Sequence, residues 1–413
     1  MLSREEIETI RSLAREYARI ALQPEQDEKK KIWIAHNDLE TNTRPLVLID
    51  QVCWSEMDVD GALEPRVSDP YWREVELWLR QAVYQWAHMP VDRVYDPYVA
   101  LPAPIRSTGW GIDADSDILR LQKSSEVASR HYKNQINEEE DLERIHTPIL
   151  RLDQEALAAI RETAGEVFDG IIPWKLAGVT MHLGLWDVIS SWMGVESCYY
   201  EIVDRPEMMH ALMEKLTAGV LSQVAQLNEM GLFDIDSHLC HCSHTHSNRL
   251  PGANCDRDRP KSKDAWAFGL AQLFTAASPA ATREFEAAYM KRIFPMFGAI
   301  YYGCCERLDD RLDIVGALPN VRKISCSPWS DRERFAERLP DGIIMSNKPS
   351  PALLATDSFN EDAARSDISR TIAAARRHNR PLEMILKDIS TVRKDPKRLW
   401  RWAEIAMEEV NRV

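Results

Sequence analysis

The sequence Ile300-Tyr301-Tyr302-Gly303-Cys304-Cys305-Glu306 is a short apolar run that stops on two thiols and a carboxylate. Three later runs also end on reactive residues: 321–326 (VRKISC), 343–348 (IIMSNK) and 384–388 (MILKD). Apolar runs of this length, separated by helical patterns, are typical of parallel strands that are buried on both faces. In a barrel of such strands the carboxyl ends meet at one mouth, where active sites lie. The pattern therefore predicts an enzyme whose thiols, carboxylates and lysines share one site.

Length and composition agree with this interpretation. A chain of 413 residues with 45% hydrophobic and 28% charged residues can form one elaborated α/β barrel. No apolar run approaches the roughly 18 residues of a membrane span, and the first six residues (MLSREE) carry no apolar export signal. We therefore expect a cytoplasmic protein that does not associate with a membrane. The net charge of -14, from 51 basic and 65 acidic residues, argues against a nucleic-acid partner.

The organisation along the chain predicts one domain that covers residues 1–413. A helical N-terminal extension is expected over residues 1–40, followed by a strand at 44–49 and a helix at 71–88. The polar stretch 109–145 is predicted to be an insertion that covers one end of the domain. From about residue 150 onward, strand and helix patterns alternate, which indicates βα units; helices are expected at 206–230 and 396–410.

The segment 199–210 (YYEIVDRPEMMH), the helical pattern after it and the run 231–236 (GLFDID) resemble the uroporphyrinogen decarboxylase superfamily. The resemblance continues through 303–306, 343–349 and 386–389 to the last helix, and it covers roughly residues 170 to 413. It implies a (β/α)8 TIM barrel with N-terminal helical additions and an inserted loop region. It also implies one of two chemistries. One is cofactor-free decarboxylation of a porphyrinogen, and the other is zinc-dependent methyl transfer between a methyl donor or thiol and a corrinoid protein.

The arginine pattern separates these two chemistries. The porphyrinogen decarboxylases hold their polycarboxylate substrate with paired arginines near the N-terminus, whereas Arg44 and Arg80 are isolated here. We therefore predict a methyltransferase that moves a methyl group from a small donor, such as a methyl ether or methylamine, to a corrinoid. The corrinoid would be carried by a separate protein, because this chain has no D-x-H-x-x-G motif. The alternative is a metal-free lyase that decarboxylates a non-porphyrin carboxylate. A homodimer is considered as the assembly.

The methyltransferase branch binds zinc through an H-x-C motif, but this chain has Tyr302-Gly303-Cys304 there, so only Cys304 carries over. Substitutes follow the neighbouring strand patterns, because strand ends that are adjacent in a barrel can share an ion. If the chain is extended, His238 and Cys240 share one side and His241 lies on the other. The predicted zinc ligands are His238, Cys240, Cys304 and Cys326. The alternative is that the cysteines pack at the mouth and the histidines form hydrogen bonds in a surface loop.

Catalytic and substrate-binding residues are predicted from their places at strand ends. Glu306 is either a proton donor, a further zinc ligand or a solvated loop acid, and the other catalytic candidates are Asp236, Lys348 and Asp388. The lysine and aspartate at 387–388 can also be a structural ion pair. Tryptophan is abundant, with 13 residues, and two tryptophans lie in predicted loops beside strand ends. The predicted substrate-binding residues are Trp186, His182, Tyr302 and Trp329.

Overall fold

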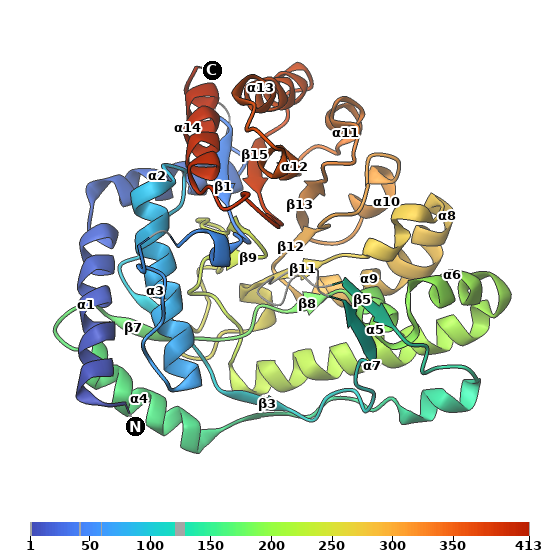
Figure 1. Cartoon of the computed structure of the whole chain (residues 1–413). Helices are drawn as coiled ribbons and strands as arrows, with labels where there is room; N and C mark the ends of the chain where they lie inside the picture. The colour runs from blue at the N-terminus through green and yellow to red at the C-terminus, as the bar shows by residue number, and fades with distance from the viewer. Residues whose placement is uncertain (1, 41–42, 59, 120–128, 413) are drawn as a thin grey trace.

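The computed structural model describes residues 2–40, 43–58, 60–119 and 129–412. At its centre lies a parallel sheet in the order β1-β15-β14-β13-β12-β11-β8, with helices around it (Figure 1). Its strands are β1 (Leu46–Ile49), β8 (His182–Leu183), β11 (Trp266–Gly269), β12 (Ala299–Tyr302), β13 (Val321–Cys326), β14 (Ile344–Asn347) and β15 (Leu382–Leu386). The predicted α/β class with a parallel sheet is confirmed. The closed, eight-stranded barrel stays a prediction.

The helices have the following bounds: α1 (Arg4–Ala21), α2 (Pro24–Asn37), α3 (Pro70–His88), α4 (Gln154–Phe168), α5 (Leu185–Met193), α6 (Val195–Asp204), α7 (Pro206–Met230), α8 (Pro279–Ala281), α9 (Ala288–Ile293), α10 (Leu312–Val315), α11 (Arg332–Arg338), α12 (Ala352–Ala355), α13 (Glu361–Arg377) and α14 (Lys397–Asn411). The helices expected at 71–88, 206–230 and 396–410 form within one residue of these limits. None of the described helices combines the length and the hydropathy that a membrane-spanning segment requires.

Side chains alternate between the two faces of the central sheet, as the twofold period of a strand demands. One face, which we call the outer face, packs on the helices and carries Val47, Ile300, Ile324 and Met384 in the main hydrophobic core. The opposite, inner face carries Leu46, Ile385, Phe268 and Tyr301 in two smaller clusters. A polar group that belongs to the inner face therefore lies away from the surrounding helices.

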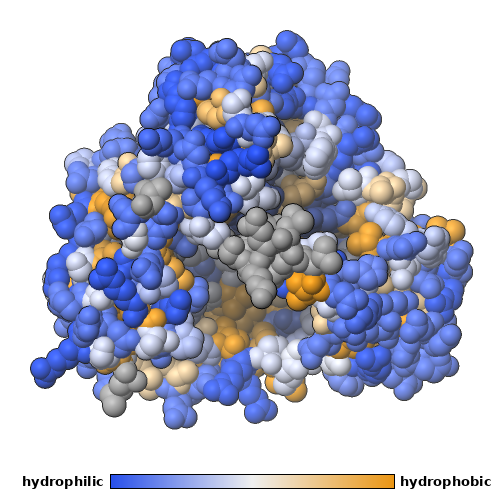
Figure 2. All heavy atoms as spheres, in the orientation of Figure 1, coloured by the Kyte–Doolittle hydropathy of each residue, from blue (hydrophilic) through white to orange (hydrophobic). Residues whose placement is uncertain are grey.

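The molecular surface agrees with this division between core and exterior. The face seen in the orientation of Figure 1 is largely hydrophilic, and hydrophobic residues gather in a hollow toward its centre (Figure 2). The helices that surround the sheet thus turn their polar sides to solvent, as amphipathic helices on a buried sheet do.

Two additions fill part of the space over the inner face. The first is Trp33 of α2, which is fully buried with Leu46 and Ile385 and donates a hydrogen bond from Nε1 to the Asp92 carbonyl oxygen (2.6 Å). The second is the antiparallel hairpin of β9 (Leu239–Cys240) and β10 (Ser243–His244). The N-terminal segment thus contains α1 and α2 and contributes to the interior through Trp33.

Two predicted segments differ in the structure. Residues 232–236 do not form a strand; only Phe233 forms a bridge there, with Val179. The Asp234 carboxylate accepts the backbone N–H groups of Asp236 (2.9 Å) and Ser237 (3.0 Å), and this local turn competes with strand pairing. Within the predicted insertion 109–145, the described residues form an antiparallel pair, β4 (Ser116–Leu119) and β5 (Ser129–Tyr132), and a 3-10 turn at Glu139–Arg144. Residues 120–128 lie outside the described part.

The remaining strands pair outside the central sheet. β2 (Val99–Pro102) runs parallel to β7 (Trp174–Ala177), and β3 (Ile105–Ser107) runs antiparallel to β6 (Leu150–Leu152). The first pair lies beside a separate core in which α1, α3 and α4 pack together. These elements position the segment from Asp92 to Tyr98, which reaches the hairpin of the interior.

Candidate functional site: a thiol cluster on the inner face

The loop after β12 turns two neighbouring thiols toward the interior. Gly303 has a φ of +90°, and a Cβ there would lie 2.6 Å from the Leu308 side chain, so the turn requires glycine. The buried Glu306 carboxylate then accepts the backbone N–H groups of Cys304 (2.7 Å) and Ala271 (3.1 Å). Glycine and Glu306 together place Cys304 in the interior cluster with Phe268.

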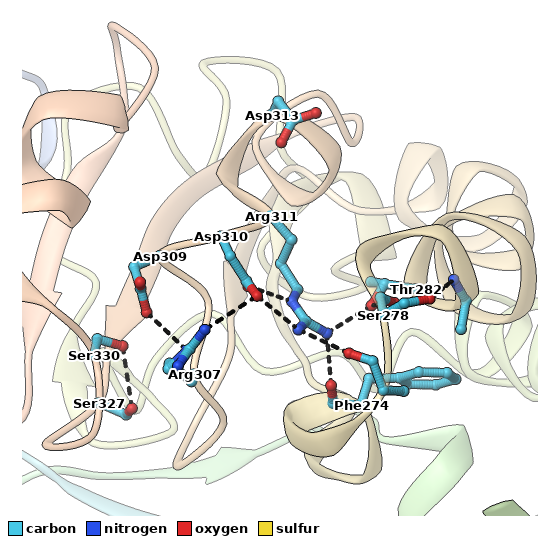
Figure 3. Close-up of polar contacts among 12 residues, drawn as sticks. Phe274, Ser278, Thr282, Arg307, Asp309, Asp310, Arg311, Asp313, Ser327 and Ser330 are labelled. Carbon is cyan, nitrogen blue, oxygen red and sulfur yellow. Dashed lines mark hydrogen bonds and ion pairs between the residues drawn. The ribbon is translucent and has the colours of Figure 1, made fainter.

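Arg311 holds the far end of this loop (Figure 3). It is almost completely buried, and its guanidinium donates to the Phe274 carbonyl oxygen (2.6 Å) and to Thr282 Oγ1 (2.8 Å). Asp310 accepts from Arg311 Nε (2.8 Å) and pairs with Arg307 (3.3 Å), which extends the network toward β13. Since a guanidinium is always charged and makes several fixed hydrogen bonds, the loop that carries the thiols has a defined shape.

The residues after β15 meet the thiols from across the inner face. Lys387 Nζ lies 2.9 Å from Cys304 Sγ and 3.0 Å from Asp388 Oδ2, and the Cys305 thiol is 3.1 Å from Asp388 Oδ2. The two sulfur atoms are 3.5 Å apart. β12 and β15 are separated by two strands in the sheet, so these contacts show that the sheet curves enough to bring their ends together.

His241 is the fifth member of this group, which we call the thiol cluster (Cys304, Cys305, Lys387, Asp388 and His241). Its ring stacks on Phe268 with centroids 3.9 Å apart, and its Nε2 atom lies 3.3 Å from Lys387 Nζ. Burial, with the nearby positive charges of Lys387 and Lys348, lowers the pKa of His241 to about 2. His241 is therefore neutral at physiological pH and can accept a hydrogen bond from Lys387.

The pKa values of the two thiols in the thiol cluster are shifted in opposite directions. The hydrogen bond from Cys305 and the Lys387 ammonium lower the pKa of Cys304, against the effect of burial. The pKa of Cys305 is raised by its interaction with Cys304 and by burial. Burial acts to lower the pKa of Lys387, but attraction to Cys304 outweighs it and raises that pKa. Cys304 is thus the more acidic thiol, and a thiolate is the form that attacks carbon or binds a metal ion.

The catalytic candidates predicted from the sequence are divided by the structure. Asp388 belongs to the thiol cluster, and Glu306 lies behind it, bonded to backbone. Lys348 is buried on the inner face, where it contacts the Tyr301 hydroxyl and donates to Ser346 Oγ (2.9 Å). Asp236 pairs instead with Lys175 and Arg257, each at 2.9 Å. These two partners are not members of the thiol cluster.

The four predicted substrate-binding residues do not lie together either. Trp186 is in α5, not in a loop; it is fully buried in the main core and donates to the Phe285 carbonyl oxygen (3.0 Å). Tyr302 is on the outer face, where its hydroxyl contacts Glu286 (3.3 Å). His182 lies in β8 with its ring 5.1 Å from that of Phe268, and Trp329 is 74% exposed after β13. His182 is therefore the member of this set that contacts the residues around the thiol cluster.

The predicted zinc ligands also separate. Cys326 lies on the outer face in the main core, because the alternation of β13 turns Ser325 inward, where it donates to the Cys304 carbonyl oxygen (2.7 Å). Cys240 is in the same interior cluster as Cys304, but His238 gathers with other residues. Among the described residues, Cys304, Cys305 and Asp388 form a group whose ligand atoms all lie within 4.8 Å of one another.

The site residues that the predicted sets omitted are Cys305, Lys387 and His241. Strand alternation through residues 238–242 predicts that His241 lies on the side opposite His238 and Cys240. The chain turns there instead: Cys240 pairs with Ser243, and His241 has a φ of +56° at the turn of the hairpin. Cys305 and Lys387 are adjacent to predicted residues, and the runs that end at each strand already contained them.

Comparison with known proteins gives a likeness of fold. No protein-family model matches this sequence, and no curated protein matches it. Among solved structures, the chain is similar to a methyltransferase from Methanosarcina mazei, with a TM-score of 0.52 and 12% sequence identity. The match covers 92% of this chain and 98% of that one. At this level of identity the similarity shows the fold and extends over nearly the whole chain.

Proposed function

We propose that the protein is a methyltransferase that moves a methyl group from a small methylated donor to a corrinoid carried by a separate protein. The observation that carries this proposal is the thiol cluster, in which two thiols and a carboxylate converge beside a buried lysine. The fold, which resembles that of a methyltransferase, supports the same chemistry. The donor and the corrinoid partner belong to the proposal.

The thiol cluster fits a zinc ion. Cys304, Cys305 and Asp388 offer two sulfur ligands and one oxygen ligand within 4.8 Å of one another, and catalytic zinc sites use three protein ligands and an open position. Two thiolates and one carboxylate carry three negative charges, which a divalent cation and the Lys387 ammonium would together neutralise. Such an ion would polarise the donor heteroatom as a Lewis acid.

The protein residues would position the donor and compensate charge. The methyl carbon would accept an electron pair from the corrinoid, and the bond from carbon to the heteroatom would break. Its electron pair would stay on the heteroatom, which would then take a proton. Lys387, whose Nζ lies 2.9 Å from Cys304 Sγ, would stabilise the negative charge that develops there. Glu306, predicted as a proton donor, is instead bonded to the Cys304 and Ala271 N–H groups, so we assign it the role of holding the loop.

The proposal is tested with free cob(I)alamin and candidate methyl donors under anoxic conditions. We expect the spectrum of methylcobalamin to appear with the wild-type protein and with Cys326→Ala, a buried cysteine on the outer face. Cys304→Ser should contain less zinc than wild type, measured by elemental analysis, and should lower the rate by at least about 100-fold, of the order seen when a group that stabilises a transition state is removed.

Two outcomes would contradict the proposal. Equal metal content in the Cys304→Ser and Cys326→Ala proteins would remove zinc from the thiol cluster. Release of carbon dioxide from a carboxylated substrate, with an unchanged corrinoid spectrum for every donor, would favour the alternative lyase. That reaction would use the two buried lysines of the inner face, Lys348 and Lys387, to hold a carboxylate.

A further inference from the structure

A second group of metal-ligating side chains lies apart from the thiol cluster and shares no residue with it. Asp96, His238 and His246 each offer one ligand atom, and these atoms all lie within 4.8 Å of one another. His246 Nε2 is 3.8 Å from Asp96 Oδ2, and the rings of His238 and His246 stack with centroids 4.3 Å apart. We call these three residues the histidine cluster.

The histidine cluster contains buried polar atoms without partners. His246 is 1% exposed, and neither of its ring nitrogens has a hydrogen-bond partner among the described residues. The buried Asp96 Oδ1 atom also has no hydrogen-bond partner among them. The Lys30 ammonium approaches that oxygen only to 3.8 Å, from a side chain that is 40% exposed. A buried polar atom without a partner costs about 1–3 kcal/mol, so three such atoms in one place indicate a ligand that satisfies them.

The neighbouring His244, in the same loop, has a hydrogen-bond partner for each of its ring nitrogens. Its Nε2 atom accepts the backbone N–H of Val94 (3.0 Å), so Nδ1 carries the proton and donates to the His238 carbonyl oxygen (3.2 Å). Both nitrogens of His244 are therefore used in holding the loop. The free nitrogens of His246, by contrast, are not needed for the fold.

The backbone around the histidine cluster is built to hold it. Asn37 of α2 donates through Nδ2 to the carbonyl oxygens of His244 (3.0 Å) and His246 (2.8 Å). His238 has a φ of +48°, a left-handed conformation that is uncommon outside glycine and that is maintained here by the surrounding hydrogen bonds. Three segments that are distant in sequence thus meet at this point: α2, the segment before β2, and the hairpin loop.

We propose that Asp96, His238 and His246 bind a divalent transition metal ion of the zinc class. Two imidazoles and one carboxylate suit such an ion. A tetrahedral ion at the usual bond lengths needs ligand atoms roughly 3.4 Å apart, and His246 Nε2 and Asp96 Oδ2 are 3.8 Å apart. Lys30 would turn to solvent when the cation neutralises Asp96. The bound ion would tie the segment before β2 to the loop that carries His241, and this function does not depend on the reaction at the thiol cluster.

The experiment uses the full chain with Cys304→Ser and Cys305→Ser, so that the thiol cluster offers no sulfur ligand. After treatment with a chelator, this protein is titrated with Co²⁺, followed by its visible absorption. We expect one equivalent to bind, with bands in the visible and without the near-ultraviolet charge transfer of a cobalt thiolate, and we expect Zn²⁺ to displace it. In the same background, Asp96→Asn and His246→Gln should each weaken binding by more than about tenfold, since even residues behind the ligands change affinity by that factor.

His131→Ala is the matched control, because this histidine of β5 is exposed and should leave binding unchanged. Asp96→Asn keeps the shape of the side chain, so circular dichroism of its metal-free form should match that of the parent. The proposal is overturned if the double cysteine variant binds no cobalt at stoichiometric concentration. It is equally overturned if both ligand variants bind cobalt as tightly as the His131→Ala control.

Discussion

At the scale of single residues, the burial of the Asp187 carboxyl group sets an expected pH dependence of stability. Asp187, Glu286 and Glu306 interact with one another, and burial together with the Glu306 charge raises the pKa of Asp187 to about 7. Because this folded-state pKa lies above the unfolded value of 3.8, the folded state binds more protons. The cost of ionising Asp187 therefore appears as the pH rises from about 4 to 7.

Asp187→Asn should remove that cost, since the amide oxygen can still accept the Gln272 N–H group. We expect the free energy of unfolding of the variant, relative to wild type, to increase by about 1–3 kcal/mol between pH 5 and pH 8. Urea unfolding at a series of pH values measures it. Asp341→Asn, at a side chain that is 99% exposed, is the control and should show a flat difference. A flat difference for Asp187→Asn as well would mean that its pKa is not raised.

At the scale of elements, the inner face of the sheet contains an ion pair between β13 and β15. Lys323 Nζ lies 2.7 Å from Glu383 Oε2 and donates to Ser243 Oγ (2.6 Å) of the hairpin, and both charged side chains are fully buried. Lys323→Met should cost about 3–5 kcal/mol of unfolding free energy, because Glu383 would keep a buried charge without its partner. Chemical denaturation measures this loss.

The double variant Lys323→Met/Glu383→Leu separates lost pairing from lost packing. Since it removes both charges, it should be more stable than Lys323→Met alone, and it can approach wild type. If the double variant is instead less stable than Lys323→Met, the unpaired Glu383 charge is not what destabilises the single variant.

The sequence predicts helices and strands well where the burial of one of their faces imposes a regular apolar period. The strands ending near Glu306, Lys348 and Asp388 and the long helix at 206–230 followed from apolar periodicity, which packing enforces over many residues. The positions of the zinc ligands are harder to predict from the sequence. Cys326 follows the same period onto the outer face, whereas His238 and His241 lie in a hairpin with left-handed residues that no period describes. Contacts across the inner face, such as Cys304 with Lys387, join positions 83 residues apart.

At the scale of the whole molecule, the N-terminal extension is part of the central fold. α1 packs on α3 and α4, while α2 sends Trp33 over the inner face, where its ring lies 5.2 Å from Lys323 Nζ. Asn37 then holds the loop of the histidine cluster. The extension therefore packs on the central fold through Trp33 and holds the loop of the histidine cluster through the Asn37 side chain.

This arrangement predicts that Trp33→Ala destabilises the whole chain. Removing a fully buried tryptophan leaves a cavity, and we expect a loss of about 3–5 kcal/mol in the free energy of unfolding. Far-ultraviolet circular dichroism and tryptophan fluorescence should report one coincident denaturant transition, shifted to lower denaturant. Leu22→Ala is the control in the same extension, because Leu22 is 72% exposed and its loss should change stability by less than about 0.5 kcal/mol. A separate early transition, with the main one unchanged, would show that α1 and α2 unfold independently of the sheet.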